Sequence, residues 1–120
     1  MDAVLFTATA NPQSSQTFYE GILGLTLVSD MPHSMVYDIN GTTLRVQKVE
    51  QVIVLPYTAL GFVVDDIAER VRSLSDKGVH FEQFESLQQD EDGIWTTPDG
   101  AKIAWCKDPD GNLVSLTQRS

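Results

Sequence analysis

Few side chains in this sequence are of the types that catalyse reactions near neutral pH. The only histidines are His33, beside a turn, and His80, at the start of an expected edge strand. Histidine titrates near neutrality, but both are expected to face solvent. Cys106, between Trp105 and Lys107, is expected to be a small strand residue rather than a nucleophile. The spacing indicates no Ser-His-Asp or Cys-His arrangement, so no catalytic residue is identified.

Side chains suited to binding a ligand are better represented. Arg45 can pair with a ligand carboxylate or phosphate, or with one of the chain's 17 acidic residues. Trp95 and Trp105 can stack on a planar or cationic ligand, although Trp105 can equally belong to the core and Trp95 to an interface. Tyr37, two residues after Met35, is a further candidate to line a cavity, with plain packing as the alternative.

One acidic segment has a superficial likeness to a calcium loop. In residues 108–112 (DPDGN) the glycine comes too early for an EF-hand, and the later bidentate acid is missing. We interpret this segment as a turn.

Composition and charge narrow the class of protein. The 120 residues, 42% of them hydrophobic, suffice for one globular domain. No apolar run approaches the ~20 residues of a membrane span, and the N-terminus has no basic signal region. The net charge of −9 with no Lys/Arg cluster argues against nucleic-acid binding, and favours a cationic ligand or simply solubility. A single cysteine allows no internal disulfide, so we expect a cytoplasmic protein.

The elements that must position these residues form two similar halves. In the first half, Asn11-Pro12 is typical of a helix start, Gly24 of a helix end, and Asn40-Gly41 of a β-hairpin. The expected elements of this half, residues 1–48, are a strand at 3–9, a helix at 12–23, and strands at 25–29, 34–39 and 42–48.

A connector at 49–56 leads to a second half in which the same order returns. Asp65-Asp66 is typical of a helix start and Gly78 of its end. The polar segment 85–93 is expected to be an exposed, mobile loop. The expected elements of this half, residues 57–120, are a strand at 57–64, a helix at 66–77, and strands at 79–84, 101–107 and 112–118. Unless the match is a coincidence of short patterns, the repeat predicts one α+β domain of two βαβββ modules.

Alternation along the strands separates a helix-covered face from an open face. The open face is expected to carry small, apolar or neutral polar side chains, with Arg45 as its one charge. Solvated faces usually carry Lys, Glu and Asp, so we expect a curved mixed sheet around a ligand pocket, with the helices outside. A face buried by a second subunit is the alternative. The expected members of the open face are Val4, Phe6, Ala8, Thr43, Arg45, Gln47, Ala59, Gly61, Val63, Ser115 and Thr117.

Three motifs carry a resemblance to a known family. They are Phe18-Tyr19 followed by Leu23-Gly24-Leu25, the run 62–66 (FVVDD), and the run 108–113 (DPDGNL), which is the most specific. They resemble the motifs of the vicinal oxygen chelate superfamily, which includes glyoxalase I, extradiol dioxygenases and bleomycin-resistance binding proteins. The motifs span nearly the whole chain and imply the glyoxalase/bleomycin-resistance fold, whereas function varies widely within the superfamily.

The resemblance also implies where a metal would be bound. Metal-dependent members place one ligand on the first and last strand of each half, which by motif spacing corresponds to Val4, Arg45, Ala59 and Ser115. None of these is a usual ligand of a divalent metal, and a guanidinium would repel one. Gln47 is a conceivable oxygen donor, but one amide does not build a site. We therefore expect no metal and no other cofactor.

The sequence thus predicts a small-molecule-binding protein of the glyoxalase/bleomycin-resistance type, rather than an enzyme, that sequesters a cationic or aromatic compound. The alternatives are a metal-independent isomerase or lyase that uses Arg45 with a carboxylate base, a metal-dependent glyoxalase-type lyase or dioxygenase, which the missing ligands disfavour, and a scaffold whose concave face is filled. As in many relatives of this size, a homodimer is expected; neither nucleic acid nor a membrane is an expected partner. The expected ligand-binding residues are Arg45, Gln47, Tyr37, Trp95, Trp105 and Ser115.

Overall fold

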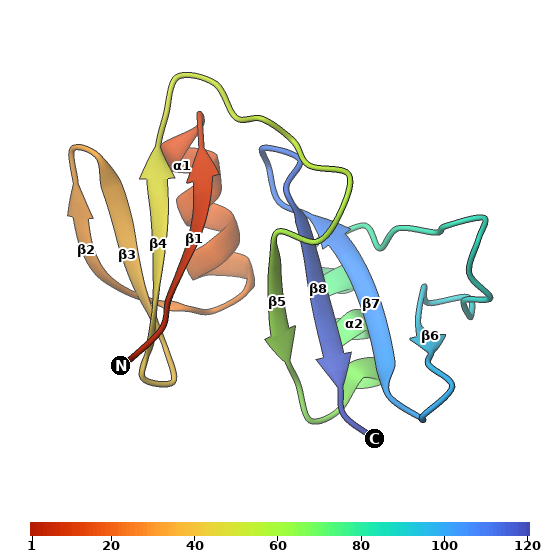
Figure 1. Ribbon diagram of the computed structural model, residues 1–120. Coiled ribbons are helices and arrows are strands. Elements are labelled where there is room, and N and C mark those ends of the chain that lie inside the picture. The colour runs from red at the N-terminus through yellow and green to blue at the C-terminus, as the bar shows by residue number, and fades with distance from the viewer. The chain divides into compact units, whose positions relative to one another are not determined.

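The strands of this protein form two four-stranded sheets, seen in a computed structural model that describes residues 1–120 (Figure 1). Contacts divide the chain into two units. Unit 1 is Met1–Leu55 with Asp108–Asn112, and unit 2 is Pro56–Lys107 with Leu113–Ser120. No helix in the chain has the length and apolar character needed to span a membrane.

Unit 1 contains one mixed sheet with the strand order β1-β4-β3-β2. β1 runs parallel to β4, and the other pairs are antiparallel. The expected helix at 12–23 is present as a short α-helix that continues as a π-helix. The elements are β1 (Val4–Thr9), α1 (Pro12–Gln16), the π-helix η1 (Thr17–Ile22), β2 (Thr26–Met31), β3 (Ser34–Ile39) and β4 (Thr42–Lys48).

Local signals determine where the elements of unit 1 begin and end. Asn40 and Gly41 both have positive φ angles, of 50° and 93°, as a two-residue hairpin turn requires. Gly24, with a φ of 78°, follows the helical segment. Asn11 precedes α1 as expected, but its side chain does not cap the helix. Its amide nitrogen instead donates to Asp110 at 3.1 Å, so the predicted capping interaction is absent.

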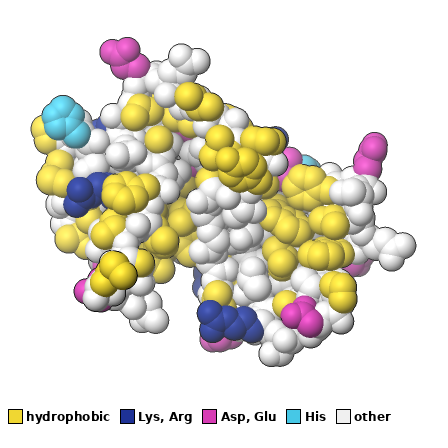
Figure 2. Space-filling view, viewed as in Figure 1, with side chains coloured by type: hydrophobic (Ala, Val, Ile, Leu, Met, Phe, Trp, Pro, Cys, Tyr) yellow, Lys and Arg dark blue, Asp and Glu magenta, His cyan; other side chains and the backbone are white.

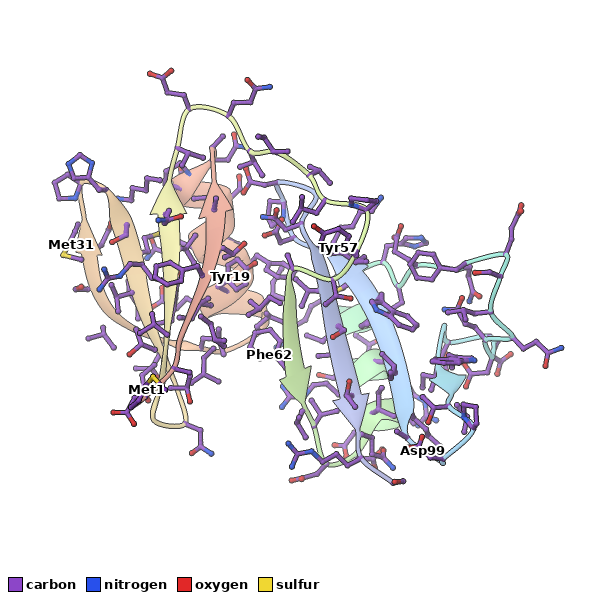
Figure 3. All side chains as sticks on the ribbon, viewed as in Figure 1. Met1, Tyr19, Met31, Tyr57, Phe62 and Asp99 are labelled. Carbon is purple, nitrogen blue, oxygen red and sulfur yellow. The ribbon has the colours of Figure 1, made fainter.

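The core of unit 1 lies between the sheet and the helical segment. Leu44 and Val46 of β4 are fully buried, and Tyr19 from η1 reaches the same core (Figure 3). The ring of Tyr19 lies 5.0 Å from that of Phe18 and 6.1 Å from that of Tyr37. The helix-facing side of this sheet is therefore an aromatic and aliphatic core.

The segment 108–112, expected to be a turn, is a turn that packs in unit 1. The carboxylate of Asp108 is buried and accepts hydrogen bonds from the Tyr19 hydroxyl at 2.7 Å and from the Asn112 side chain at 2.9 Å. Asp110 accepts from the Thr9 hydroxyl at 2.5 Å. Asn112 donates to the carbonyl of Ala8 at 2.9 Å. The acidic groups of this turn thus accept hydrogen bonds from side chains of unit 1 and stabilise its fold.

Unit 2 repeats the arrangement, with the strand order β5-β8-β7-β6 and β5 parallel to β8. Because each half has the order strand, helix, then three strands, the expected α+β class with two βαβββ modules is confirmed. β5 is shorter than the expected strand at 57–64. The elements are β5 (Leu60–Val63), α2 (Ile67–Asp76), β6 (Trp95–Thr96), β7 (Lys102–Lys107) and β8 (Leu113–Gln118).

α2 forms where the sequence predicts it and covers one face of its sheet (Figure 1). The carboxylate of Asp66 caps its first turn by accepting from the Glu69 amide at 3.2 Å. Ile67, Val71 and Leu74 are each 1% exposed, because their spacing places them on the side that faces the sheet.

The expected strand at 79–84 is wrong. Only Phe81 makes an isolated bridge, to Cys106, and the edge strand is β6 instead. The side chain of Gln89 forms hydrogen bonds with backbone groups that would otherwise pair with a neighbouring strand. Its nitrogen donates to the carbonyls of Glu82 and Gly93 at 2.9 and 2.8 Å, and its oxygen accepts from the Phe84 amide at 2.6 Å.

Candidate functional site

The sheet of unit 2 brings both tryptophans to the face opposite α2. Trp105 of β7 pairs with Ser115 of β8, and Trp95 of β6 pairs with Ile103, two residues before Trp105. Alternation therefore places all four side chains on one face, while Val114 and Leu116 face the core. Ser115 thus lies on the predicted face, although its side chain is buried there.

Trp95, Trp105 and Phe84 form an aromatic cluster on this face. The two indole rings lie 6.3 Å apart with 30° between their planes. Phe84 meets Trp105 edge-on, with ring centres 5.4 Å apart and an 89° angle. Both tryptophans are half-buried, so each retains ring surface that a ligand can contact. The sequence reasoning missed Phe84, because it placed this residue in an edge strand.

The polar group of Trp105 already has a partner. Its indole nitrogen donates to the hydroxyl of Thr58 at 3.2 Å, which orients the ring. The part of the indole ring that remains exposed is available to an incoming molecule. Such a surface attracts planar rings and cations. The cluster is therefore suited to bind flat or positively charged compounds.

The open face of the unit 1 sheet carries the expected arginine at its centre. Arg45 lies in β4 opposite Phe6 of β1 and Val36 of β3, and Gln47 lies two residues along the same face. Arg45, Gln47 and Phe6 are exposed. Figure 2, viewed from the side opposite α1, shows Lys or Arg atoms among hydrophobic side chains over this sheet. Arg45 makes no ion pair and no hydrogen bond, so the structural salt bridge considered from the sequence is absent.

Tyr37 does not share that face. It pairs with Leu44, is fully buried, and belongs with Met35 to the core, because the register of β3 directs both toward the helical segment. The hydroxyl of Tyr37 has no hydrogen-bond partner. Burial, with smaller contributions from the charges of Glu20 and Asp30, raises the pKa of Tyr37 to about 12. Tyr37 and Met35 therefore pack in the core, and the expectation that they line a cavity is corrected.

The positions that correspond to metal ligands do not fit a divalent metal. Val4 and Arg45 lie on the open face of the unit 1 sheet, whereas Ala59 precedes β5 and Ser115 lies in β8. Their only oxygen donor is the hydroxyl of Ser115, and Arg45 contributes a positive charge. No group of three or more His, Cys, Asp or Glu side chains is arranged to hold a metal ion.

The other reactive residue types are not assembled into a catalytic arrangement. His80 is exposed, and its Nε2 lies 3.7 Å from the carboxylate of Glu82, which Lys107 also approaches at 3.5 Å. Cys106 lies in β7, a strand residue as predicted, and is buried in the core, 1% exposed. His33 is exposed in the turn between β2 and β3.

Two surface hollows contain none of the residues expected to bind a ligand. One of about 380 Å³ lies at the start of α2 and includes Asp66, Asp90 and Lys102. Another, of about 400 Å³, lies beside α1 and η1 and includes Gln16 and Glu20. Neither contains an aromatic side chain, so we base no binding site on them.

Comparison with known proteins shows the family. The model of the Glyoxalase/Bleomycin resistance protein/Dioxygenase superfamily matches residues 4–116. A glyoxalase family protein from Bacillus anthracis has a similar structure, with a TM-score of 0.78 at 12% identity, covering 100% of this chain and 95% of that one. No curated protein matches the chain in sequence.

Two further structures of similar fold carry functional names. An antibiotic binding protein from Streptomyces sp. CB03234 has a TM-score of 0.77 at 21% identity, covering 100% of this chain and 96% of that one. A lactoylglutathione lyase from Agrobacterium tumefaciens has a TM-score of 0.73 at 18% identity, covering 98% and 94%. Together with the strand order of both sheets and the family match over residues 4–116, these findings establish that the chain belongs to the Glyoxalase/Bleomycin resistance protein/Dioxygenase superfamily.

Proposed function

We propose that this chain is a small-molecule-binding protein that sequesters an aromatic or cationic compound and works without a metal. The observation that carries the proposal is the pair of half-buried tryptophans on the face opposite α2, with their rings 6.3 Å apart. The similar fold of an antibiotic binding protein supports it. The residues at the ligand positions of metal-dependent members support the metal-free part.

Physical chemistry favours flat or cationic ligands at the aromatic cluster. Each ring contact contributes about 0.5–1.5 kcal/mol beyond the burial of apolar area, and a cation over an indole face contributes about 0.5–2 kcal/mol. The net charge of −9 also attracts cations from solution. A planar cation gains from all three effects, so we infer that it binds more tightly than a neutral ring of equal size.

Intrinsic fluorescence tests this directly, because Trp95 and Trp105 are the chain's only tryptophans. We expect titration with N-methylquinolinium to quench the emission, with weaker effects from the neutral quinoline, which lacks the charge, and from tetramethylammonium chloride at equal ionic strength, which lacks the ring. The same ligands should raise the melting temperature in the same order, through mass action.

Variants separate binding at the cluster from general effects on the protein. Trp95→Leu should weaken binding of N-methylquinolinium at least about tenfold, whereas Trp95→Phe keeps a ring and should weaken it less. Tyr57→Leu removes an exposed aromatic residue of unit 2 outside the cluster and serves as the matched control. Absence of quenching by any planar compound, or equal affinity in Trp95→Leu, would contradict the proposal.

The metal-free part has its own test. Elemental analysis of protein purified without chelator should find no divalent metal at one equivalent per chain. Added Zn²⁺ or Ni²⁺ should leave the melting temperature unchanged, because no set of donor side chains binds the folded state preferentially. A stoichiometric metal, or a melting temperature that rises with added metal, would contradict it.

We also propose that the chain acts as a homodimer. Support comes from large apolar side chains left in contact with solvent, among them the consecutive residues Ile53, Val54 and Leu55, which are 81%, 53% and 41% exposed. Exposed apolar runs of this kind are typical of surfaces that other proteins cover.

A further inference from the structure

Arg45 is an uncompensated cation in a strongly acidic protein. The chain has 17 acidic residues, yet none approaches the guanidinium within ion-pair distance. An acidic side chain on the same face is that of Asp38, which pairs with Thr43, two residues before Arg45 on β4, and makes no ion pair. Lys48, by contrast, contacts Asp30 at 2.5 Å. The hydrogen-bond donors of Arg45 therefore remain available.

The neighbours of Arg45 across the sheet are apolar. Phe6 lies directly opposite on β1 and is 52% exposed, and Val36 lies opposite on β3. Val4, two residues before Phe6 on the same face, is 47% exposed. Adjacent strands lie about 4.8 Å apart, so a ligand that reaches Arg45 also contacts Phe6 and Val36.

We propose that the open face of the unit 1 sheet binds an organic monocarboxylate. The guanidinium of Arg45 donates two parallel hydrogen bonds to the carboxylate, and the ring of Phe6 with Val36 receives the apolar or aromatic body of the ligand. This site lies in a different unit from the aromatic cluster, uses different residues, and goes beyond the function proposed above.

The surroundings of Arg45 select a carboxylate over a phosphate. The fork of a guanidinium matches a carboxylate with two hydrogen bonds. A phosphate dianion needs more donors, and no second Lys or Arg lies on the paired open-face positions of β1, β3 and β4. The net charge of −9 and the nearby Asp38 also repel a dianion more strongly than a monoanion.

The experiment compares two ligands of nearly the same shape, one with a charged carboxylate and one with a neutral carboxamide. We expect 2-naphthoate to bind the wild-type protein at least about tenfold more tightly than 2-naphthamide in calorimetric titration, since hydrogen bonds to charged groups are the stronger ones. In ¹H–¹⁵N spectra, 2-naphthoate should shift the amide signals of Phe6, Val36 and Arg45. Inorganic phosphate should leave them in place.

Variants of the two contact residues test each part of the site. Arg45→Met removes the charge at an exposed position and should abolish the preference for naphthoate over naphthamide, and Arg45→Lys should restore only part of it. Phe6→Ala should weaken both ligands and keep the preference. Arg72→Met, at an exposed position of α2, is the matched control and should behave as wild type.

The outcomes separate this proposal from the one for the aromatic cluster. Quenching of tryptophan fluorescence by N-methylquinolinium should persist in Arg45→Met, and naphthoate binding should persist in Trp95→Leu. The carboxylate proposal is overturned if wild type shows no preference for naphthoate, if Arg45→Met retains the preference, or if naphthoate shifts the signals of Trp95 and Trp105 instead.

Discussion

Two buried tyrosines in unit 1 differ in what their hydroxyls contact. The hydroxyl of Tyr19 donates to the buried carboxylate of Asp108 at 2.7 Å. The hydroxyl of Tyr37 is equally buried but has no hydrogen-bond partner. An unpartnered buried hydroxyl costs about 1–3 kcal/mol, whereas a hydrogen bond to a charged acceptor contributes about 1.5–3 kcal/mol. The same chemical group thus stabilises the fold at one position and opposes it at the other.

Replacement of each tyrosine by phenylalanine measures this difference. Tyr19→Phe should lower the free energy of unfolding by about 1.5–3 kcal/mol, because Asp108 loses a donor. Tyr37→Phe should leave it unchanged or raise it, because the unpartnered hydroxyl is removed. Urea denaturation gives both values, with Tyr57→Phe at an exposed position as control. Equal losses at positions 19 and 37 would contradict the hydrogen-bond assignment.

The raised pKa of Tyr37 also predicts how stability responds to alkaline pH. The phenol titrates at about 12 in the folded chain and near its ordinary value of about 10 in the unfolded chain. Between these values the folded state binds the phenol proton more tightly than the unfolded state does. The stability of the fold that depends on the protonated phenol is therefore fully present below pH 10 and is lost as the pH rises toward 12. The loss amounts to at most about 3 kcal/mol.

The comparison with Tyr37→Phe isolates this contribution from other groups that titrate at high pH. The difference in unfolding free energy between wild type and Tyr37→Phe should be constant from pH 8 to 9.5. From there to pH 11.5 the variant should become more stable relative to the wild type. Parallel curves over the whole range would show that the phenol titrates alike in both states.

At the scale of elements, sequence predicts best where the signal is local. Asn40-Gly41, Gly24 and Asp66 act within a few residues, and each marks the boundary that the structure shows. The prediction of a strand at 79–84 is wrong because backbone groups of this segment hydrogen-bond to the side chain of Gln89 rather than to a neighbouring strand. Alternating residue types cannot reveal that competition, since a glutamine in a polar loop has no distinctive pattern.

The candidate binding residues follow the same logic. Alternation places Arg45, Gln47 and Ser115 on open faces, because the period of two is a property of each strand. The side on which Tyr37 faces depends on the pairing of β3 with β4, and the proximity of Trp95 to Trp105 depends on the pairing of β6 with β7. Register between strands is set by the whole fold, so a single sequence does not reveal it.

The loop before β6 offers a test at this scale. Gln89→Ala removes three hydrogen bonds to the backbone of residues 82–93. We expect faster hydrogen exchange at the Phe84 amide and earlier proteolytic cleavage within 82–93. The tryptophan emission should also change, because Phe84 contacts Trp105. Gln88→Ala, at the exposed neighbouring position, should change none of these, and similar effects in both variants would contradict the role of Gln89.

At the scale of the whole molecule, charge and exposed apolar surface act in opposite directions. The net charge of −9 repels a second copy, whereas exposed apolar side chains favour its binding. Repulsion between like-charged proteins is screened as ionic strength rises, since the Debye length falls from about 30 Å at 0.01 M to about 8 Å at 0.15 M. The proposed homodimer should therefore be more stable at physiological salt than at low salt.

Sedimentation equilibrium at the two salt concentrations tests this balance. At 0.15 M salt the mass should be twice the 13.3 kDa of the chain, with partial dissociation at 0.01 M. Ile53→Asp adds a charge to the most exposed residue of the apolar run 53–55 and should shift the equilibrium toward the monomer, whereas Glu50→Asp, which keeps the charge at an exposed neighbouring position, should not. A monomer in 0.15 M salt at about 100 μM would contradict the dimer. A dimer unaffected by Ile53→Asp would place its interface elsewhere, since burying an unpaired carboxylate there is strongly unfavourable.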